Sequence, residues 1–529
     1  MVDRASPGSA AAGETSPTLA ALTHEQLRIL AYASAIGSEF DFDLLAASMG
    51  LSEEALVEQL ERLVHDGVLR ERAGGGRFGF EEEEFRARVY RSLTESRLRV
   101  LHRKIAEVME RMHPDPTPAE LAELGRHFFL GKVPEKSYQY NRKAAEVARA
   151  AEEPEVAVHH LERVLVDLTS LAGDHRADEM EVSRALGDLY FALGNFRAAD
   201  RCYTDALAKA DTGDPRTQPR LLLARAEVAR ENLEVETAVA RATEALHLFE
   251  RAGDRVGMAQ TFRLLGRIAF QRGRYREALD ECMRAMDALP PKAEPQLLGR
   301  LSIDIGNSFA LLGANVRSEA IEWYGRAVDR LRQTGDWAEL SRAYHNLGVT
   351  VGEERPTEGL EYLDQAREAA ERAHDARSTG RALLSGVELR LALGELEEAQ
   401  RDNEQAGRLL ERLGDTFSVQ QVCMNRGLIA EKLGQWDEAA HAFEESLAIA
   451  QRYELTADIA EVEFYLARLR FKTRDLDGAR AAFKVATDLK VAELRPHHAQ
   501  GYDELKRQLE AAEAGAVPRP GPSTDQHPL

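Results

Sequence analysis

Arginine recurs along the middle of this sequence at a nearly regular interval. Arg300, Arg342 and Arg381 follow one another at nearly equal steps, and Arg220 lies about two such steps before Arg300. A guanidinium group offers N–H donors in a planar fork that matches a carboxylate. The series therefore predicts binding of an acidic or carboxylate-ended ligand, provided that the fold brings these arginines onto one face.

The residue patterns of common catalytic and metal sites do not occur in the sequence. It contains no G-x-S-x-G elbow and no H-E-x-x-H motif. His159-His160 and His497-His498 are adjacent pairs, and neighbours on a helix point about 100° apart, so neither pair predicts a metal site. The cysteines are far apart without C-x-x-C spacing, which favours packing roles; they are Cys202, Cys282 and Cys423. We predict a non-enzymatic protein without a cofactor.

The composition indicates a helical, water-soluble protein. Of 529 residues, 44% are hydrophobic, 30% are charged and only 6% are aromatic, and Ala, Leu, Glu and Arg, which favour helices, dominate. A net charge of −21 repels nucleic acid and anionic membranes. No apolar run reaches the ~18 residues of a membrane helix, and no secretory leader is visible. We therefore expect a cytoplasmic protein.

One pattern of small and large residues repeats through most of the chain. In one copy Leu186 and Gly187 are followed by Ala199, Tyr203 and Ala206. Nine copies follow one another at a nearly constant step of roughly 40 residues, within the range of helical repeats. Their centres are Ala145, Gly187, Ala226, Gly266, Gly306, Gly348, Val387, Gly427 and Ala467. Such a period predicts stacked hairpins, because one hairpin cannot bury its apolar face alone.

Each copy is expected to form two helices joined by a short turn. The small residue at the Gly187-type position would let the first helix approach the second, and large residues such as Tyr203 and Phe443 would fill the space between consecutive hairpins. Glycine suits the residue after a helix and aspartate suits the next N-cap. Four pairs fit hairpin ends in this way: Gly213-Asp214, Gly253-Asp254, Gly335-Asp336 and Gly414-Asp415.

Leu-Gly, Tyr, Ala, Phe and Ala in this order and spacing resemble the tetratricopeptide repeat, whose usual unit is about 34 residues. The predicted fold is all-α: a superhelical solenoid of α-hairpins over residues 118–490, with about nine repeats of about 40 residues and an extra leading helix. A capping helix is expected over residues 491–515, and disordered ends over residues 1–21 and 516–529.

The resemblance also implies which side chains line a concave groove. In this family they lie six, three and two residues before the Gly187-type position and one residue after it, on the first helix of each hairpin. In this sequence the basic and amide residues at those positions are Arg220, Arg263, Arg267, Arg300, Asn307, Arg342, Asn346, Arg381 and Asn425. The family clamps peptides with such residues, so an acidic or carboxylate-ended peptide is the expected ligand. A merely solvated face is the alternative, because arginine is abundant throughout the chain.

Residues 22–113 do not follow the repeat and predict a small separate domain. Thr23 and Gln26 form a capping-box pattern at the start of its first helix. The expected elements are helices over Leu22–Ala35, Asp41–Met49 and Ser52–His65, a β-hairpin over Val68–Phe80, and two trailing helices over Glu83–Leu93 and Glu95–Met112. Three helices and a hairpin predict a winged-helix domain.

This segment resembles the winged-helix module of STAND-type signalling regulators, multidomain ATPases whose C-terminal arm is often a tetratricopeptide solenoid. The resemblance rests on the run from Leu30 to Gly37 and on Phe78, Phe80, Tyr90, His102 and Ala106; the family's His after the second Phe is Glu82 here. The G-x-x-x-x-G-K-[ST] phosphate loop is absent from the sequence. The resemblance thus implies a regulator arm whose nucleotide switch is missing or belongs to another chain, such as a signalling ATPase or kinase.

Nucleic acid is a disfavoured partner of the N-terminal domain. Residues 22–115 contain 13 Lys or Arg and 18 Asp or Glu, a net of −5, and the helix over Ser52–His65 that would read DNA carries four Glu and one Arg. A DNA reader needs a basic face. The sequence therefore favours a scaffold or regulatory sensor arm that binds a protein or peptide, with a DNA-binding regulator and a small-molecule sensor as the alternatives.

Overall fold

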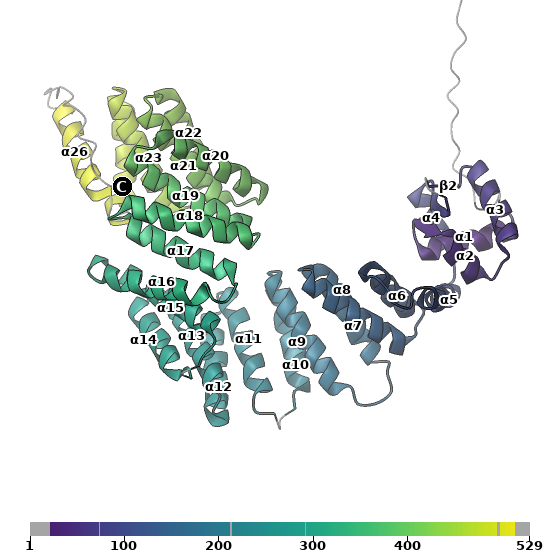
Figure 1. Cartoon of the computed structure of the whole chain (residues 1–529). Coiled ribbons are helices and arrows are strands. Elements are labelled where there is room, and N and C mark those ends of the chain that lie inside the picture. Colours follow the sequence, from purple (N-terminus) through teal and green to yellow (C-terminus); the bar gives the residue numbers. More distant parts are fainter. Residues whose placement is uncertain are drawn as a thin grey trace, which may run out of the picture. The chain divides into compact units, whose positions relative to one another are not determined.

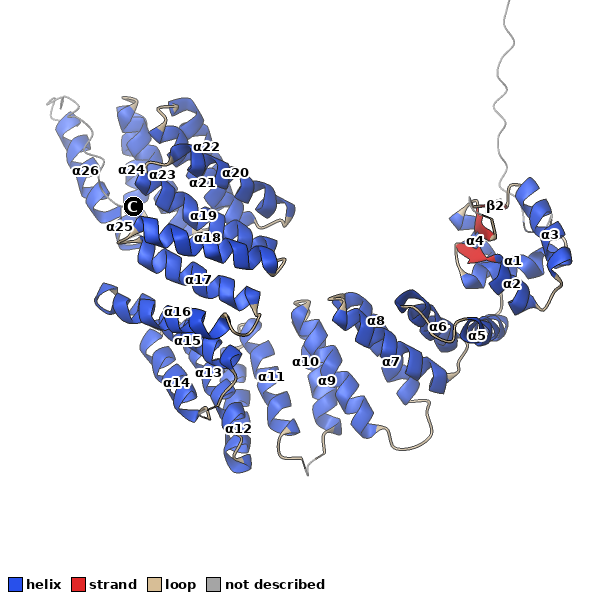
Figure 2. Cartoon of the chain, viewed as in Figure 1, coloured by secondary structure: helices blue, strands red, loops and turns tan. Residues whose placement is uncertain are grey.

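The computed structural model describes Leu19 and residues 22–72, 75–211, 214–290, 292–494 and 498–513. The two predicted disordered ends lie outside the described residues, except Leu19, as do His497 and Gly213. The chain divides into two compact units, Met1–Leu248 and Phe249–Leu529, and each is treated by itself below. Helices make up most of both units (Figure 2).

The first unit begins with short helices and a small sheet. Its N-terminal elements are α1 (His24–Ile36), β1 (Glu39–Asp41), α2 (Phe42–Met49), α3 (Glu53–His65), β2 (Leu69–Glu71), β3 (Arg77–Phe80), α4 (Glu83–Arg91) and α5 (Glu95–Met112). The remaining helices of this unit are α6 (Pro118–Leu130), α7 (Pro134–Ala150), α8 (Pro154–Leu168), α9 (Arg176–Ala192), α10 (Phe196–Lys209), α11 (Thr217–Glu231) and α12 (Val235–Ala252), which crosses into the second unit.

The second unit continues with helical pairs (Figure 1). Its elements are α13 (Arg255–Gln271), α14 (Tyr275–Ala288), α15 (Pro295–Leu312), the short 3-10 helix η2 (Ala314–Val316), α16 (Arg317–Leu331), α17 (Trp337–Gly352), α18 (Pro356–Arg372), α19 (Ala376–Leu393), α20 (Leu396–Arg412), α21 (Thr416–Lys432), α22 (Trp436–Arg452), α23 (Thr456–Lys472), α24 (Leu476–Asp488), α25 (Val491–Leu494) and α26 (Ala499–Glu513).

The sequence period is confirmed by the order of these helices. Each of the nine predicted centres, from Ala145 in α7 to Ala467 in α23, falls in the first helix of a pair. Helix α6 occupies the place of the extra leading helix. Where one capping helix was expected, the short α25 precedes α26. The fold is an all-α solenoid of hairpins.

The glycine at the centre of a copy lies against a large residue of its own hairpin. A Cβ added to Gly187 would lie 2.5 Å from the Tyr203 ring, and one added to Gly306 would lie 2.6 Å from the Tyr324 ring. The expectation that these rings only fill the space between hairpins was therefore incomplete. Tyr203 also belongs to a buried cluster that includes Leu221 of the next hairpin, so one ring joins both interfaces.

The glycine–aspartate pairs end hairpins in three of the four predicted places. Gly253, Gly335 and Gly414 have φ angles of 66°, 70° and 63°, which glycine adopts without steric cost. The aspartate after each accepts a backbone hydrogen bond at the start of the next helix, from Gly257, Glu339 and Ser418 respectively. The fourth prediction was wrong for Asp214, because the N-cap of α11 is Arg216.

The N-terminal domain has a strand that the sequence did not predict. All the expected helices and the hairpin are present, and Thr23 and Gln26 form the capping box. Strand β1 pairs antiparallel with β3, with Phe40 opposite Phe78, and gives the sheet order β1-β3-β2. Phe40 is buried and its ring lies 6.2 Å from that of Phe80. That these elements make a winged-helix domain stays a prediction.

Candidate peptide-binding face

The first helices of successive hairpins contact one another in the second unit. Helix α13 contacts α15, α15 contacts α17, α17 contacts α19 and α19 contacts α21. Among the described residues of this unit, no two second helices make comparable contacts. Because, in the described part of this unit, only the first helices approach one another across neighbouring hairpins, they line the inner side of the stack. We call their side chains at the four predicted positions the inner face.

Two of the predicted arginines converge on one glutamate of the inner face. Arg300 lies 3.1 Å from Glu339 and 3.0 Å from Asp336, and Arg342 lies 2.7 Å from the other oxygen of Glu339. Burial opposes ionisation of Asp336, yet hydrogen bonds from Gln296, the Glu339 backbone and Arg300 hold its pKa below the ordinary value. These guanidinium groups are thus fixed in direction and partly neutralised.

Further along the inner face, another arginine pairs with an acid one repeat later. The Nε of Arg263 lies 2.6 Å from an oxygen of Asp304, and both side chains are largely buried. Arg267 is half-buried on the same helix, one turn from Arg263. The acidic partners Asp304, Asp336 and Glu339 were not among the predicted site residues.

Amide side chains form a second contact between neighbouring first helices. The Nδ2 of Asn346 donates to the Oδ1 of Asn307 over 2.8 Å, and the Tyr324 hydroxyl donates to the same oxygen over 2.8 Å. With its oxygen occupied twice, Asn307 keeps an amide N–H₂ group for another acceptor. His345 extends this contact, because its ring lies 3.4 Å from Asn346 and its Nε2 lies 3.0 Å from the Ser385 hydroxyl.

Three of the predicted site residues take no part in the inner-face contacts described above. Arg381 is exposed on α19, and no hydrogen bond or ion pair is found for it among the described residues. Asn425 is 0% exposed, accepts from Gln421 over 3.4 Å, and its Nδ2 has no hydrogen-bond partner in the described structure. Arg220 belongs to the first unit and is therefore not placed relative to the others.

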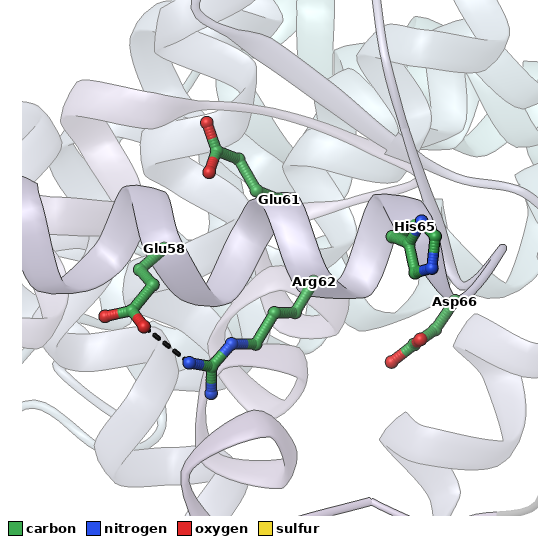
Figure 3. Close-up of a pocket in the computed structure, with 5 residues that line it drawn as sticks. All are labelled: Glu58, Glu61, Arg62, His65 and Asp66. Atoms are coloured by element: carbon green, nitrogen blue, oxygen red, sulfur yellow. Dashed lines mark hydrogen bonds and ion pairs between the residues drawn. The ribbon is translucent and has the colours of Figure 1, made fainter.

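Helix α3, which would read DNA if the N-terminal domain bound it, presents acids instead of cations. A shallow depression of about 410 Å³ runs along the outer side of α3; it is lined by Glu58, Glu61, Arg62, His65 and Asp66. Figure 3 shows the single guanidinium of this group turned toward Glu58, with which it forms an ion pair. In the neighbouring hairpin, Arg70 lies 3.7 Å from Glu81 and Arg72 is paired with Glu39.

Reactive groups are scarce in the part of the chain that the structure describes. The three cysteines are free thiols, and burial raises the pKa of the Cys282 thiol to about 12, which keeps it protonated and inert. No cluster of three or more metal-binding side chains occurs among the described residues. Within the same ranges, no helix is long and apolar enough to cross a membrane.

Three solved structures are similar to this chain at low sequence identity. A STAND protein with a tetratricopeptide repeat sensor from Pyrococcus horikoshii is 13% identical, with a TM-score of 0.47; the match covers 82% of this chain and 64% of that one. Aspartyl phosphate phosphatase F from Bacillus subtilis is 14% identical, with a TM-score of 0.43, over 67% and 94% of the two chains. A Rap protein complexed with competence and sporulation factor is 15% identical, with a TM-score of 0.43, over 68% and 93%.

One hairpin matches a family model. Residues 420–453, which run from within α21 to the end of α22, match the tetratricopeptide repeat. No curated protein matches the sequence. A Cβ added to Gly427 in the matched hairpin would lie 2.5 Å from Phe443, the same contact as in the hairpins of Gly187 and Gly306. The matched hairpin is a tetratricopeptide repeat; it shares its period with the helical pairs from α7 to α24 and this contact with hairpins in both units, so the other pairs resemble it.

Proposed function

We propose that this chain is a non-enzymatic, cytoplasmic scaffold or regulatory sensor arm that binds an extended peptide segment of a partner protein along the inner face of its second unit. The observation that carries the proposal is a row of polar contacts, each of which joins a first helix to the next. The row consists of Arg263–Asp304, Asn307–Asn346, His345–Ser385 and Glu388–Gln421.

The spacing of this row suits an extended chain. Packed helices lie about 8–10 Å apart, and a strand rises about 3.3 Å per residue, so roughly three peptide residues pass each first helix. Polar side chains held between helices can therefore meet the peptide backbone at regular intervals, and the remaining N–H₂ group of Asn307 is one such donor. Holding the donors in place beforehand lowers the entropic cost of binding.

An acidic or carboxylate-ended segment fits the charges of this face. Arg300, Arg342 and Arg381 occupy the same repeat position on successive first helices. Asp336 and Glu339 balance the first two, whereas Arg381 has no ion pair in the described structure. A carboxylate of the ligand can therefore compete for all three guanidinium groups, and Arg381 is available to it without displacing an acid.

The N-terminal domain is proposed to dock a protein and not DNA, with a separate signalling ATPase or kinase as the partner to look for. The acidic outer side of α3 and the pairing of Arg70 and Arg72 with acids support this choice.

A pull-down from native lysate with mass spectrometry tests the inner-face proposal. The bait carries Arg300→Ala, Arg342→Ala and Arg381→Ala together, and its helicity is checked by circular dichroism. The matched control removes three exposed arginines from second helices of the same unit, Arg326→Ala, Arg401→Ala and Arg408→Ala, with the same change in charge.

The proposal expects one partner to be recovered by the wild type and the control but lost by the inner-face variant. Equal recovery by all three baits contradicts the inner-face assignment. If no protein is enriched over a control bait, the small-molecule sensor becomes the better account, and a thermal-shift screen with metabolites would follow.

A further inference from the structure

A buried chain of hydrogen bonds links α4, α5 and α6 in the first unit. The Tyr90 hydroxyl of α4 lies 2.8 Å from Nε2 of His102 in α5, and Nδ1 of His102 lies 2.8 Å from Nδ1 of His127 in α6. The exposed fractions of His102 and His127 are 1% and 0%. Two imidazole nitrogens at this separation must share a single proton, since one has to donate and the other to accept.

The direction of this chain is set by Arg126. One Nη of Arg126 lies 2.8 Å from Nε2 of His127, 2.8 Å from the carbonyl oxygen of Ile36 at the end of α1 and 2.6 Å from the Glu123 carboxylate, so its two N–H groups are shared among three acceptors. A guanidinium group has no lone pair and only donates. Nε2 of His127 therefore accepts, its proton sits on Nδ1 and is donated to His102, and His102 donates from Nε2 to Tyr90.

Glu123 does not change this assignment. Its carboxylate lies 3.5 Å from Nε2 of His127 but accepts two bonds from Arg126, over 2.6 and 3.0 Å. A proton on Nε2 of His127 would point at an N–H group of Arg126 across 2.8 Å. A proton on Nδ1 of His102 would likewise point at the Nδ1–H group of His127 across 2.8 Å. Both imidazoles must therefore be neutral for the chain to remain intact.

We infer that the Arg126–His127–His102–Tyr90 chain is a proton-controlled switch, which holds the end of the N-terminal domain against α6 while both imidazoles are neutral and releases it on acidification. Acid acts on Nε2 of His127 and Nδ1 of His102, the two ring nitrogens that accept hydrogen bonds in this chain. Protonation of either nitrogen breaks its bond directly, without movement of another group. The switch lies where the N-terminal domain meets the helix that precedes the repeats, so the solution pH would govern how firmly that domain is held.

The surroundings favour the neutral form of both rings. Burial, the neighbouring His127 and Arg126 lower the pKa of His102 to about 3, against a partial opposing effect of Glu123. Burial, together with the Arg126 charge, likewise lowers the pKa of His127, although the negative charge of the nearby Glu123 opposes the shift. Other titratable groups on the elements around the pair include Asp43 of α2 and Arg28 of α1, both exposed, and Tyr32 of α1 with Lys104 of α5. Further groups are Arg86 with Glu83 in α4, Arg103 with Glu107 in α5, Glu110 of α5 with Lys136 and Tyr140 of α7, and Arg163 of α8.

Linkage sets the pH window of the switch. A histidine whose pKa is lowered by folding contributes its full stability above the unfolded value of 6.5, and the contribution falls as the pH drops below that value. At about pH 5 the requirement that His102 stay neutral weakens the closed form about thirtyfold relative to about pH 8, and His127 acts in the same direction.

Hydrogen–deuterium exchange of the full chain at about pH 8, 6.5 and 5, corrected for intrinsic exchange rates, tests the switch. We expect protection of peptides from α4, α5 and α6 to fall by tenfold or more at the lowest pH, while peptides from α15 and α16, which contain no histidine, keep theirs. An unchanged protection of α4–α6 would overturn the inference, as would an equal loss in α15 and α16, which signals general acid unfolding. This arm needs no variant.

Two variants assign the response to the histidine pair. His102→Gln with His127→Gln removes both titrating rings and should abolish the pH response of α4–α6. The matched control is His160→Gln on α8, another buried histidine, which lies 2.8 Å from Asn141; this variant should retain the response. A response that persists in the double variant would contradict the inference.

Discussion

Phe443 packs so closely against Gly427 that a Cβ on the glycine would be 2.5 Å from the ring. Phe443 is fully buried and its ring also stacks on Tyr465 of the next hairpin at a centroid distance of 5.6 Å. The Phe443 ring therefore fits its own hairpin only because Gly427 has no side chain, and the same ring stabilises the contact with the following hairpin.

Replacing this glycine should be costly in spite of helix propensity. Gly427→Ala is expected to lower the free energy of unfolding by about 1–3 kcal/mol, because the ring must shift in a packed core. Gly325→Ala on α16 is the control: a Cβ there meets nothing within 4 Å, so alanine should stabilise by about 0.5–1 kcal/mol. Urea denaturation followed by circular dichroism measures both, and a neutral Gly427→Ala would contradict the packing account.

A histidine occupies a turn position where other hairpins have glycine. His374 has a φ of 53° and precedes Asp375, which caps α19, in the same way that Gly414 with a φ of 63° precedes Asp415. His374→Gly should raise the free energy of unfolding by up to about 1 kcal/mol by relieving left-handed strain. The converse change, Gly414→Ala, should lower it. Thermal denaturation of the two variants would reveal a wrong sign in either.

Asp167 gives the first unit a pH dependence opposite to that of the histidine pair. It is 5% exposed on α8, one of its oxygens has no hydrogen-bond partner, and burial raises its pKa from 3.8 to about 6. The ionised form therefore destabilises the fold as the pH rises from about 4 to above 6. Asp167→Asn should stabilise by about 1–3 kcal/mol near pH 8.

The pH dependence provides the check on Asp167. Because the unfolded and folded carboxyl groups are both protonated below about pH 4, the gain from Asp167→Asn should disappear there. Urea midpoints of the wild type and the variant across this pH range measure the difference. A gain that does not change with pH would mean that the carboxylate is not destabilised in the fold.

Glu339 is expected to restrain ligand binding. It pairs with both Arg300 and Arg342, so Glu339→Gln should free Arg342, leave Arg300 with Asp336 alone, and strengthen binding of an acidic partner by roughly three- to tenfold at low salt. Glu322→Gln on α16, an exposed glutamate paired with Arg326, is the control with the same change in charge. Recovery of the partner over a salt series compares them, and weaker recovery with Glu339→Gln would argue against an acidic ligand.

The period of the sequence predicted the fold because it is a physical property of stacked hairpins. Gly187, Gly306 and Gly427 fall in first helices, and Gly335 and Gly414 end helices, as expected from their spacing alone. Strand β1 was missed because three residues are too few to show an alternating pattern, and only the pairing of Phe40 with Phe78 holds them in a sheet.

The acidic partners of the inner face were missed for a different reason. Arg300 meets Asp336 and Arg263 meets Asp304, in each case across nearly one full repeat of the sequence. A period of about 40 residues brings neighbouring positions of successive repeats together, so a search for acids near the position one repeat after each arginine would have indicated them. The complete burial of Asn425 could not be predicted, because it depends on how closely α19, α20 and α22 pack around α21.

The most direct test of peptide binding places a photo-crosslinking residue on each side of the stack. Val349 follows Gly348 at an inner-face position on α17, and Val485 lies on the second helix α24; both side chains are 38% exposed. Equal exposure means that random collision labels both positions alike. We predict that the partner recovered by the wild type is crosslinked from position 349 and not from position 485. Crosslinking from position 485 alone, or equally from both, would contradict binding along the inner face.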